Sequence, residues 1–588
     1  MKNIFGFLSL ILLFACNNAE KKAVETDVNK PFEEYKNNFI NELWQTYPGW
    51  ALGVGKHDFD SILVIPNEDT RKKELAFANN HLDSLKKYPI EGLSNNNKTD
   101  YYLIENLLKG SIWSTTELKS HEWNPSNYNV SEAFSIILST EFDNLENRLD
   151  IFYKRMANIP AYFEAAKQNI KNPTVEHTQL AIAQNLGGLA VFETELEDAL
   201  AKSKLDENTK TELLKRADQS IAAVKDYTDW LKNLKNDNPR SFRLGKELYA
   251  KKFEFDIQSG NTVEEIYQKA LKSKAELHLK MAEITHNLWN KYFKQPVPTD
   301  TLQAIKMLID KISTKHVHPD SFQTAIEQQI PVLVDFIKQK DLIYIDPSKP
   351  LVVRKEPAYM AGVAGASISS PGPYEKNGNT YYNVGSMEGW PKEQAESYLR
   401  EYNHYILQIL NIHEAIPGHY TQLVYSNQSP SLIKAILGNG TMIEGWAVYT
   451  ELMMLENGYG NNEPEMWLMY YKWNLRTVCN TILDYSVHVN NFTKEEAIHL
   501  LVNEAFQQTA EAEGKWKRAT LTQVQLCSYF TGFKEIYEFR EEYKALKGKE
   551  FDLKKFHEKF LSYGSAPVKH IREMMLGEAS PTPPKEEL

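Results

Sequence analysis

Apolar residues recur at spacings of three and four along most of this chain, and this helical period restricts the fold more than any other feature. The pattern runs from about residue 31 to 345, returns after Trp390 and ends near Gly577. Clusters of Asn, Pro and Gly interrupt it where turns are expected. The sequence contains no repeated unit of the length found in solenoids. We therefore predict a mainly α-helical protein.

Residues 346–390 depart from this period, because they are rich in Gly, Pro and Ser. Within them, the segments LVV and TYYNV have the β-branched and aromatic residues typical of strands. We predict a small β-sheet here, near the candidate active site. The TYYNV strand is a candidate to pair with an extended substrate, and a purely structural edge strand is the alternative.

The length of 588 residues allows three or four domains or a single large one. We predict one large two-lobed domain over residues 31–578, with an N-terminal helical lobe at about 31–345 and a catalytic part at about 346–578. Residues 579–588 are expected to form a frayed, disordered tail. The net charge of −11 argues against a dedicated nucleic-acid-binding protein.

The first residues have the pattern of a secretion signal. The apolar run from Ile4 to Ala15 is shorter than the roughly 20 residues of a membrane-spanning helix, so residues 1–15 are predicted to be a signal peptide. The segment LFAC ending at Cys16 is similar to a bacterial lipobox, which makes Cys16 the predicted lipidation site. Residues 16–30 would then be a flexible tether and the lipid the only membrane anchor of an extracytoplasmic lipoprotein. An ordinary signal peptide with a coincidental cysteine is the alternative.

Cys479 and Cys527 are the remaining cysteines. In an oxidising compartment they can form one disulfide, and two free buried thiols are the alternative.

Two histidines flank a Pro-Gly pair in the segment HEAIPGH, which runs from His413 to His419. In the metallopeptidase pattern H-E-x-x-H, histidines four residues apart bind one metal ion and the glutamate between them is the base. Here Pro417 occupies the fourth position and the second histidine comes at the sixth. On a regular helix that histidine lies about 120° away from the first, so one ion does not reach both.

Pro417 and Gly418 suggest how the two histidines can meet. A proline inside a helix removes one hydrogen bond and clashes with the preceding turn, and bulges occur at such places. We predict a two-residue bulge that brings His419 beside His413. Two unrelated histidines beside a helix break are the alternative.

A second helical segment, EGWAVYTE, supplies Glu444 and Glu451. Two histidines and one glutamate leave a coordination position open for water, as in catalytic zinc sites. Glu444 is flanked by apolar residues and is the predicted third ligand. Glu451 lies seven residues later on the same helix face, where it can orient a histidine through its other ring nitrogen. A solvent-facing acid is the alternative for Glu451.

These motifs resemble the bacterial family known as domain of unknown function 885, whose hallmarks are H-E-A-x-P-G-H and E-G-W-A-x-Y-x-E. Further similar segments lie at 121–129, 476–489, 525–532 and 556–568, so the resemblance covers nearly the whole mature chain. It implies a zincin-like fold with a deep cleft, related to the helical carboxypeptidases and oligopeptidases of the gluzincin type. The chain departs from the family at Tyr420, where a further histidine is common, and at residues 522–525.

The resemblance implies a zinc metallopeptidase. One zinc ion per chain would be held by His413, His419 and Glu444, and Glu414 would be the general base. Tyr529 and His488 are candidates to stabilise the oxyanion, and satisfied core residues are the alternative for both. Asp484 is expected to support the site. A peptide substrate with a free carboxylate would need an arginine, and the candidates are Arg476, Arg518 and Arg540.

Two other functions remain open at this stage. A non-catalytic surface lipoprotein would bind peptides or a partner protein, although the intact Glu414 argues against it because a binding module needs no base. A zinc hydrolase acting on a non-peptide bond would use the same residues. Phosphate-binding Gly motifs and the serine-hydrolase motif G-x-S-x-G are absent from the sequence.

Overall fold

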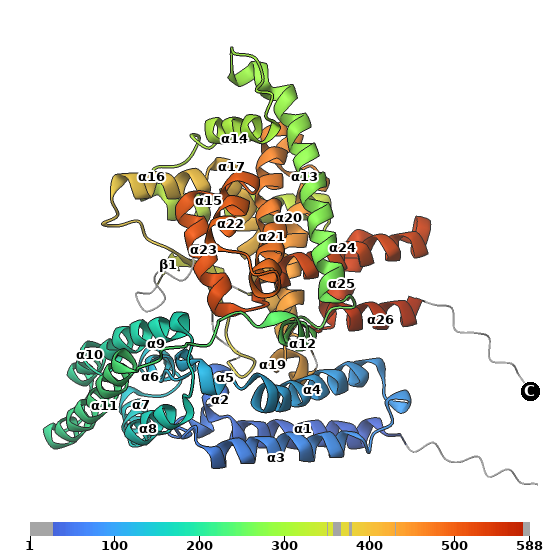
Figure 1. The fold of residues 1–588 in the computed structure, drawn as a ribbon. Coiled ribbons are helices and arrows are strands. Elements are labelled where there is room, and N and C mark those ends of the chain that lie inside the picture. Colours follow the sequence, from blue (N-terminus) through green and yellow to red (C-terminus); the bar gives the residue numbers. More distant parts are fainter. Residues whose placement is uncertain (1–26, 350, 357–365, 376–378, 430, 580–588) are drawn as a thin grey trace, which may run out of the picture.

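The computed structural model describes residues 27–349, 351–356, 366–375, 379–429 and 431–579. Cys16, the predicted signal peptide and the last nine residues lie outside these ranges. Most of the described chain is helical, with one small sheet, which confirms the prediction of a mainly α-helical protein. Figure 1 shows the N-terminal helices as a layer beneath the helices of the later sequence.

The N-terminal helices form two groups, and each group has its own apolar core. The first group contains α1 (Asn29–Thr46), α2 (Pro48–Gly53), α3 (Glu68–Leu85) and α4 (Asn95–Trp113). The second contains α6 (Ser131–Ser139), α7 (Leu145–Met156), α8 (Ile159–Asn169), α9 (Val175–Gly187), α10 (Thr194–Lys202) and α11 (Glu207–Asn233). The short helix α5 (Ser120–Trp123) precedes this group, and its Trp123 packs in the largest core.

The largest apolar core joins the sheet with the remaining helices except α19 (Leu432–Ile436), whose Ile433 and Ile436 pack in the core of the first N-terminal group. Before the sheet come α12 (Gly245–Ile257), α13 (Val263–Tyr292), α14 (Thr301–Ile312) and α15 (Phe322–Lys340). After it come α16 (Lys392–Glu401), α17 (His404–Glu414), α18 (His419–Asn427), α19 (Leu432–Ile436), α20 (Gly440–Glu456), α21 (Pro464–Val489), α22 (Lys494–His499), α23 (Thr509–Thr522), α24 (Ser528–Lys547), α25 (Leu553–Ser562) and α26 (Val568–Ala579).

Helices α12 to α15, which precede the sheet, share the largest core with the helices that follow it. Helix α13 packs along α21, and α15 packs against α17, so both belong to the core that surrounds the candidate site. The change of period at residue 346 comes shortly before the first strand of the sheet. The division into two lobes at about residue 345 stays a prediction, because helical spacing does not show which neighbour a helix will pack against.

The sheet has three strands in the order β1 (Leu351–Lys355), β3 (Thr380–Val384), β2 (Ala366–Ser369). The segments LVV and TYYNV fall in β1 and β3, so both strand predictions are confirmed. β3 is the central strand, parallel to β1 and antiparallel to β2. The prediction that TYYNV could pair with a substrate is therefore wrong, because both of its edges are already paired. A period of two identifies a strand but not its neighbours.

Two hydrogen bonds attach the sheet to the helices behind the site. The Tyr382 hydroxyl donates to Asn411 Oδ1 at 2.8 Å, and Asn411 Nδ2 donates to Gln329 Oε1 at 2.6 Å. Because these residues lie on β3, α17 and α15, the two hydrogen bonds position β3, and with it β2, relative to α17, the helix that carries His413.

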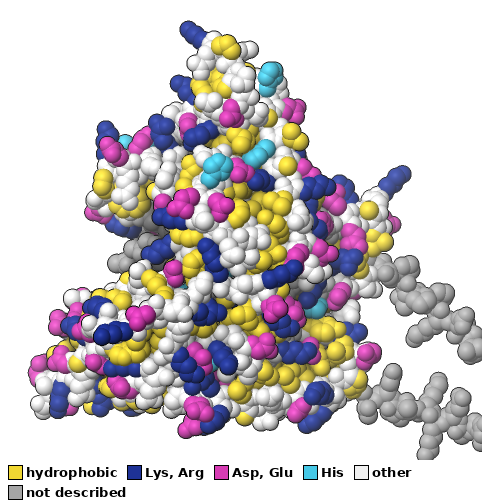
Figure 2. All heavy atoms as spheres, viewed as in Figure 1, with side chains coloured by type: hydrophobic (Ala, Val, Ile, Leu, Met, Phe, Trp, Pro, Cys, Tyr) yellow, Lys and Arg dark blue, Asp and Glu magenta, His cyan; other side chains and the backbone are white. Residues whose placement is uncertain are grey.

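The outer face seen in Figure 2 mixes acidic, basic and apolar side chains, without a large area of one charge. Among the helices of the described ranges, none is both long enough and apolar enough to cross a membrane. Cys479 and Cys527 are both buried free thiols.

Candidate metal centre

The segment between the two histidines breaks the helix. Helix α17 ends at Glu414 and α18 begins at His419. The prediction of a bulge within one continuous helix is therefore wrong, because the helix is broken instead. The side chains of His413 and His419 nevertheless come together. Proline lacks an N–H and clashes with the preceding turn, which favours a full break here. The chain then folds back, and Gly418 N donates to Ile412 O at 2.9 Å.

Gly418 is the residue that makes this close return possible. A Cβ atom at this position would lie 1.8 Å from His413 O and 2.4 Å from Ile412 O, so a larger residue would push the two helices apart. Trp446 Nε1 donates to Pro417 O at 2.9 Å and fixes the break against α20. The two sequence motifs are thereby joined by a direct hydrogen bond.

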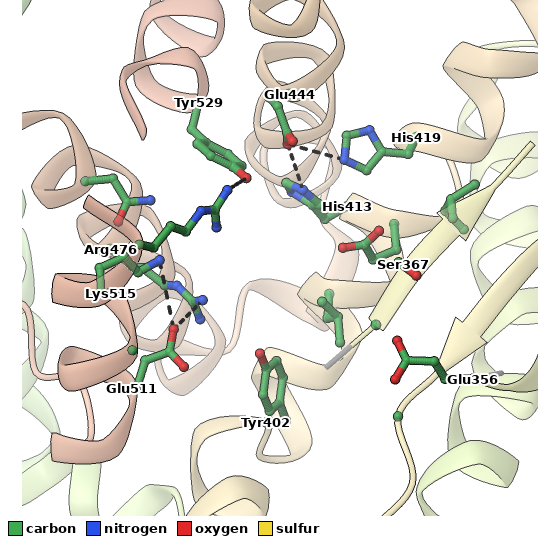
Figure 3. Close-up of a pocket in the computed structure, with 18 of the residues that line it drawn as sticks. Glu356, Ser367, Tyr402, His413, His419, Glu444, Arg476, Glu511, Lys515 and Tyr529 are labelled. Carbon is green, nitrogen blue, oxygen red and sulfur yellow. Dashed lines mark hydrogen bonds and ion pairs between the residues drawn. The ribbon is translucent and has the colours of Figure 1, made fainter. Parts of the chain in front are cut away.

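His413, His419 and Glu444 converge from α17, α18 and α20 (Figure 3). Glu444 Oε2 lies 3.4 Å from His419 Nε2 and 3.7 Å from His413 Nε2. Three ligands at about 2.1 Å from one tetrahedral ion stand about 3.4 Å apart, so these separations fit a metal ion. Within the described ranges, Glu444 Oε2 is also a buried acceptor without a well-formed hydrogen bond. The three residues can hold a metal ion and leave further positions open.

Glu451 lies behind His413 and contacts its other ring nitrogen. Glu451 Oε1 is 2.7 Å from His413 Nδ1 and also accepts a hydrogen bond from Trp473 Nε1 at 3.0 Å. When Nδ1 donates to this carboxylate, the lone pair of Nε2 points toward Glu444. Glu451 is fully buried, so the alternative of a solvent-facing acid does not apply.

The buried charges perturb one another strongly. Burial lowers the pKa of His413, but its contacts with Glu444 and Glu451 outweigh this and raise the pKa to about 10. Burial raises the pKa of Glu444, yet the two neighbouring histidines bring it far below the usual range. A cation that binds between these side chains must displace the proton of His413, so binding is expected to release protons.

Glu414 and Tyr529 line the same cavity, whose volume is about 1600 Å³. The Glu414 carboxylate has no hydrogen-bond partner within the described ranges, and burial raises its pKa. Burial and the nearby Glu444 raise the pKa of Tyr529, so its hydroxyl keeps its proton. This hydroxyl accepts a hydrogen bond from Arg518 Nη2 at 3.0 Å, which leaves its own proton free to donate.

The close packing of α20 and α24 brings Glu444 and Tyr529 into one cavity. The two helices meet at Gly445 and Gly532. A Cβ atom on Gly532 would lie 1.9 Å from Thr441 O, and one on Gly445 would lie 2.3 Å from the carbonyl carbon of Gly532. Both helices therefore need glycine at this crossing.

His488 and Asp484 do not line the cavity, contrary to the sequence-based prediction. His488 Nε2 lies 2.8 Å from Ala519 O, and its ring stacks on Tyr249. Asp484 accepts hydrogen bonds from the Tyr249 hydroxyl at 2.6 Å and from Val524 N at 2.8 Å. Both lie farther along α21 than Asn480, which does line the cavity, so the rise of the helix carries them past its end.

Of the three candidate arginines, Arg476 and Arg518 line the cavity and Arg540 does not. Arg540 instead pairs with Glu456, with a shortest distance of 2.7 Å. Sequence reasoning overlooked Glu511 and Lys515, which line the cavity beside the two arginines. Their spacing was a usable signal, since residues 511, 515 and 518 share one face of a helix. Trp473 was also overlooked, and no motif marks it.

One protein-family model, described as "Bacterial protein of unknown function (DUF885)", matches residues 48–575. A solved structure of a candidate lipoprotein of unknown function from Shewanella oneidensis is 56% identical, covers 93% of this chain and 99% of its own, and has a TM-score of 0.86. A second candidate lipoprotein, from Colwellia psychrerythraea, is 16% identical over 94% of this chain and 99% of its own, with a TM-score of 0.76, and shares the fold. No curated protein matches the chain.

Proposed function

This chain belongs to the bacterial family of unknown function DUF885, and we propose that it is a zinc-dependent peptidase acting on extracytoplasmic peptides. The observation that carries the proposal is the convergence of His413, His419 and Glu444 beside the free carboxylate of Glu414 in one cavity. Two histidines and a carboxylate also bind Fe(II) in oxygenases. A candidate base in the same cavity, Glu414, favours hydrolysis, because an oxygenase has no need of one.

The proposed roles follow from where each side chain lies. Zinc, when bound, would lower the pKa of a water molecule and polarise the substrate carbonyl. Glu414 would take a proton from the attacking water and return it to the amine nitrogen as the C–N bond breaks. Tyr529 would donate its hydroxyl proton to the developing oxyanion, and its hydrogen bond from Arg518 would strengthen that donation.

The strand β2 supports a peptide as the substrate. Ala366, Ser367 and Ile368 line the cavity, and β2 has β3 as its single strand neighbour within the described ranges. An extended peptide can add to such a free edge through its backbone. An edge strand beside histidine- and glutamate-bearing helices is also the arrangement that a zincin-like fold requires, and we include that fold in the proposal.

The proposed location is outside the cytoplasm, with the protein held to a membrane by a lipid on Cys16. The signal-like residues 1–15 and the LFAC segment support this, and both similar solved structures are of candidate lipoproteins. The segment between Cys16 and the start of α1 at Asn29 would give the enzyme reach from the membrane surface.

Metal dependence of peptide cleavage tests the proposal. The soluble chain starting at residue 17 would be stripped with a chelator, reloaded with zinc or Fe(II), and incubated with a mixed peptide pool read by mass spectrometry. We expect cleavage to stop on stripping and to return with zinc. Cleavage that persists in fully stripped protein would contradict the proposal. A zinc-loaded protein that cleaves no peptide would favour a non-peptide substrate or a binding role.

A further inference from the structure

We propose that one wall of the cavity is a subsite for a carboxylate group of the peptide substrate, built from Lys515, Arg518 and Arg476. This cationic wall is formed by α23 and α21, and Figure 3 shows Arg476 and Lys515 across the cavity from His419. The inference rests on the proposed peptidase function and adds to it the class of substrate.

The charges of the cationic wall do not balance. Glu511 is the one carboxylate within 4 Å of any of the three cations, as far as the described ranges show. It lies 2.6 Å from Arg476 Nη2 and 3.9 Å from Lys515 Nζ. Two arginines and one lysine therefore face a single carboxylate, so the wall has more basic than acidic side chains.

Lys515 is the least compensated member. Its side chain is 4% exposed, and no hydrogen bond to its Nζ is found within the described ranges. Burial and the neighbouring Arg476 lower the pKa of Lys515 well below its usual range. Burying an ammonium group is costly when its nearest carboxylate is 3.9 Å away, and a substrate carboxylate in the cavity would supply a closer partner.

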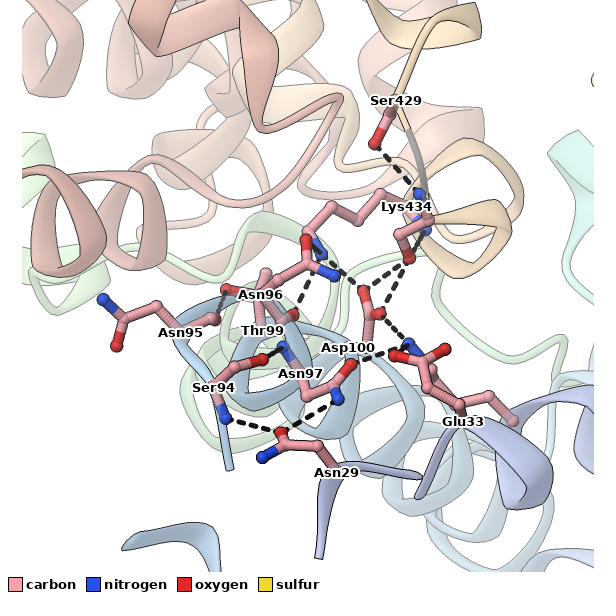
Figure 4. A network of polar contacts seen from close by, with 12 residues as sticks. Asn29, Glu33, Ser94, Asn95, Asn96, Asn97, Thr99, Asp100, Ser429 and Lys434 are labelled. Carbon is pink, nitrogen blue, oxygen red and sulfur yellow. Dashed lines mark hydrogen bonds and ion pairs between the residues drawn. The ribbon is translucent and has the colours of Figure 1, made fainter. Parts of the chain in front are cut away.

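The other buried lysines of the described ranges each lie within about 3 Å of a carboxylate. Lys434 Nζ lies 2.6 Å from Asp100 Oδ1 and 2.8 Å from Asn96 Oδ1, as Figure 4 shows. Lys472 lies 2.8 Å from Glu401, in the same part of the structure as the cationic wall. Lys515 has no carboxylate this close to its Nζ. Among Lys434, Lys472 and Lys515, it is the one that lines the large cavity.

The arginines add donors that are free for an anion. Arg518 Nη2 donates to Gln525 Oε1 at 2.7 Å and to the Tyr529 hydroxyl, and both acceptors are neutral. No ion pair of Arg518 is found within the described ranges. Arg476 Nη1 is buried and lacks a hydrogen-bond partner there. A carboxylate bound to this wall would be close to Tyr529, and so to the bond being cleaved.

Two sources supply such a carboxylate, namely the free C-terminus of a peptide and the side chain of Asp or Glu. The first would make the protein trim peptides from their C-terminal end, and the second would give it a preference for acidic residues. Both place the same group against the same cations, so matched peptides are needed to separate them.

The test compares kcat/KM of the zinc-loaded chain on two matched pairs. In the first pair, one peptide has a free C-terminal carboxylate and the other has a C-terminal amide. In the second pair, both peptides have the C-terminal amide, and one contains a Glu where the other contains a Gln. We expect at least one pair to differ by about tenfold or more, the size of a charge-assisted hydrogen bond. The first pair reports the C-terminal source and the second the side-chain source. Equal rates within both pairs would overturn the proposal.

Lys515→Met keeps most of the length of the side chain and removes its amine. We expect this variant to lose most of the preference found in the parent chain. Lys544→Gln is the control, because Lys544 is exposed, its charge is screened by solvent, and it does not line the cavity. A preference that is unchanged in Lys515→Met would overturn the assignment. If Lys515→Met does not fold, the peptide preferences of Arg518→Gln and of the parent chain still test the proposed subsite.

Calorimetry separates failure of this subsite from failure of the peptidase proposal. Zinc-loaded Glu414→Gln would be titrated with each member of the two peptide pairs, which measures affinity without turnover. If the parent chain cleaves no peptide, the proposed function falls, yet tighter binding of the carboxylate-bearing peptide would still support the subsite. Equal affinity for both members of both pairs would overturn it.

Discussion

His413 and Glu451 lie on different helices, and Nδ1 of the histidine is 2.7 Å from Oε1 of the carboxylate. This contact holds the ring so that Nε2 faces Glu444 and His419. Partners of this kind commonly change metal affinity about 10- to 100-fold when they are removed. We therefore expect Glu451→Gln to fold normally and to bind zinc about 10- to 100-fold more weakly.

Competition with a chromophoric chelator measures this change. Glu456→Gln is the matched control, because Glu456 lies on the same helix and pairs with Arg540, which does not line the cavity. An unchanged zinc affinity in Glu451→Gln would show that the contact with His413 does not tune the site.

Gly418→Ala tests the helix break. The added Cβ would overlap His413 O, so α17 and α18 must separate and His419 must move away from His413. We expect a loss of stability of about 1–3 kcal/mol, typical of overpacking, together with a large loss of zinc affinity. Gly440→Ala is the control, since a Cβ there meets nothing within 4 Å. Wild-type zinc affinity in Gly418→Ala, read by the same chelator competition, would contradict this account of the break.

The sequence predicted the candidate metal ligands as a set but not how the chain brings them together. The six-residue spacing of the histidines indicated a distortion at Pro417 and Gly418, and the structure contains a complete break in its place. Local sequence could not show that Trp446 would hold this break from another helix. Local sequence also could not show that α20 and α24 would cross closely at Gly445 and Gly532, because these two glycines lie far apart in the sequence.

Predictions failed where they depended on neighbours in space. His488 resembled a site residue, but it lies past the end of the cavity on the same helix. The segment TYYNV was correctly predicted as a strand. It is the central strand because β2 pairs with its second edge, and the sequence pattern did not predict β2 as a strand. Lys515 carried a helical spacing signal that was not used, because a charged helix face is most often solvated.

His557 gives the fold a dependence on pH that is separate from the site. It is fully buried, its Nδ1 lies 2.8 Å from Leu342 O, and the Tyr449 hydroxyl lies 2.7 Å from Nε2. Burial lowers the pKa of His557 to about 4, against about 6.5 in the unfolded chain. Between these values the unfolded state binds more protons, so stability falls as the pH drops, by up to about 1.4 kcal/mol per pH unit.

Urea unfolding at several pH values from 7 to 4 measures this slope. We expect His557→Gln to be less stable at pH 7 and to lose less stability on acidification than the parent chain does. His318→Gln is the control, because His318 is largely exposed. An identical pH slope in the parent and His557→Gln would contradict the role given to this histidine.

The most direct test of the account compares the parent chain with Glu414→Gln, both started at residue 17. Zinc content and cleavage of a mixed peptide pool would be measured on the same samples. Glu414 contributes no ligand to the predicted metal set, so both proteins are expected to hold about one zinc ion per chain. Only the parent should cleave peptides, because the variant lacks the base. Equal cleavage by both proteins, or a parent chain that cleaves peptides without holding zinc, would contradict the central claim.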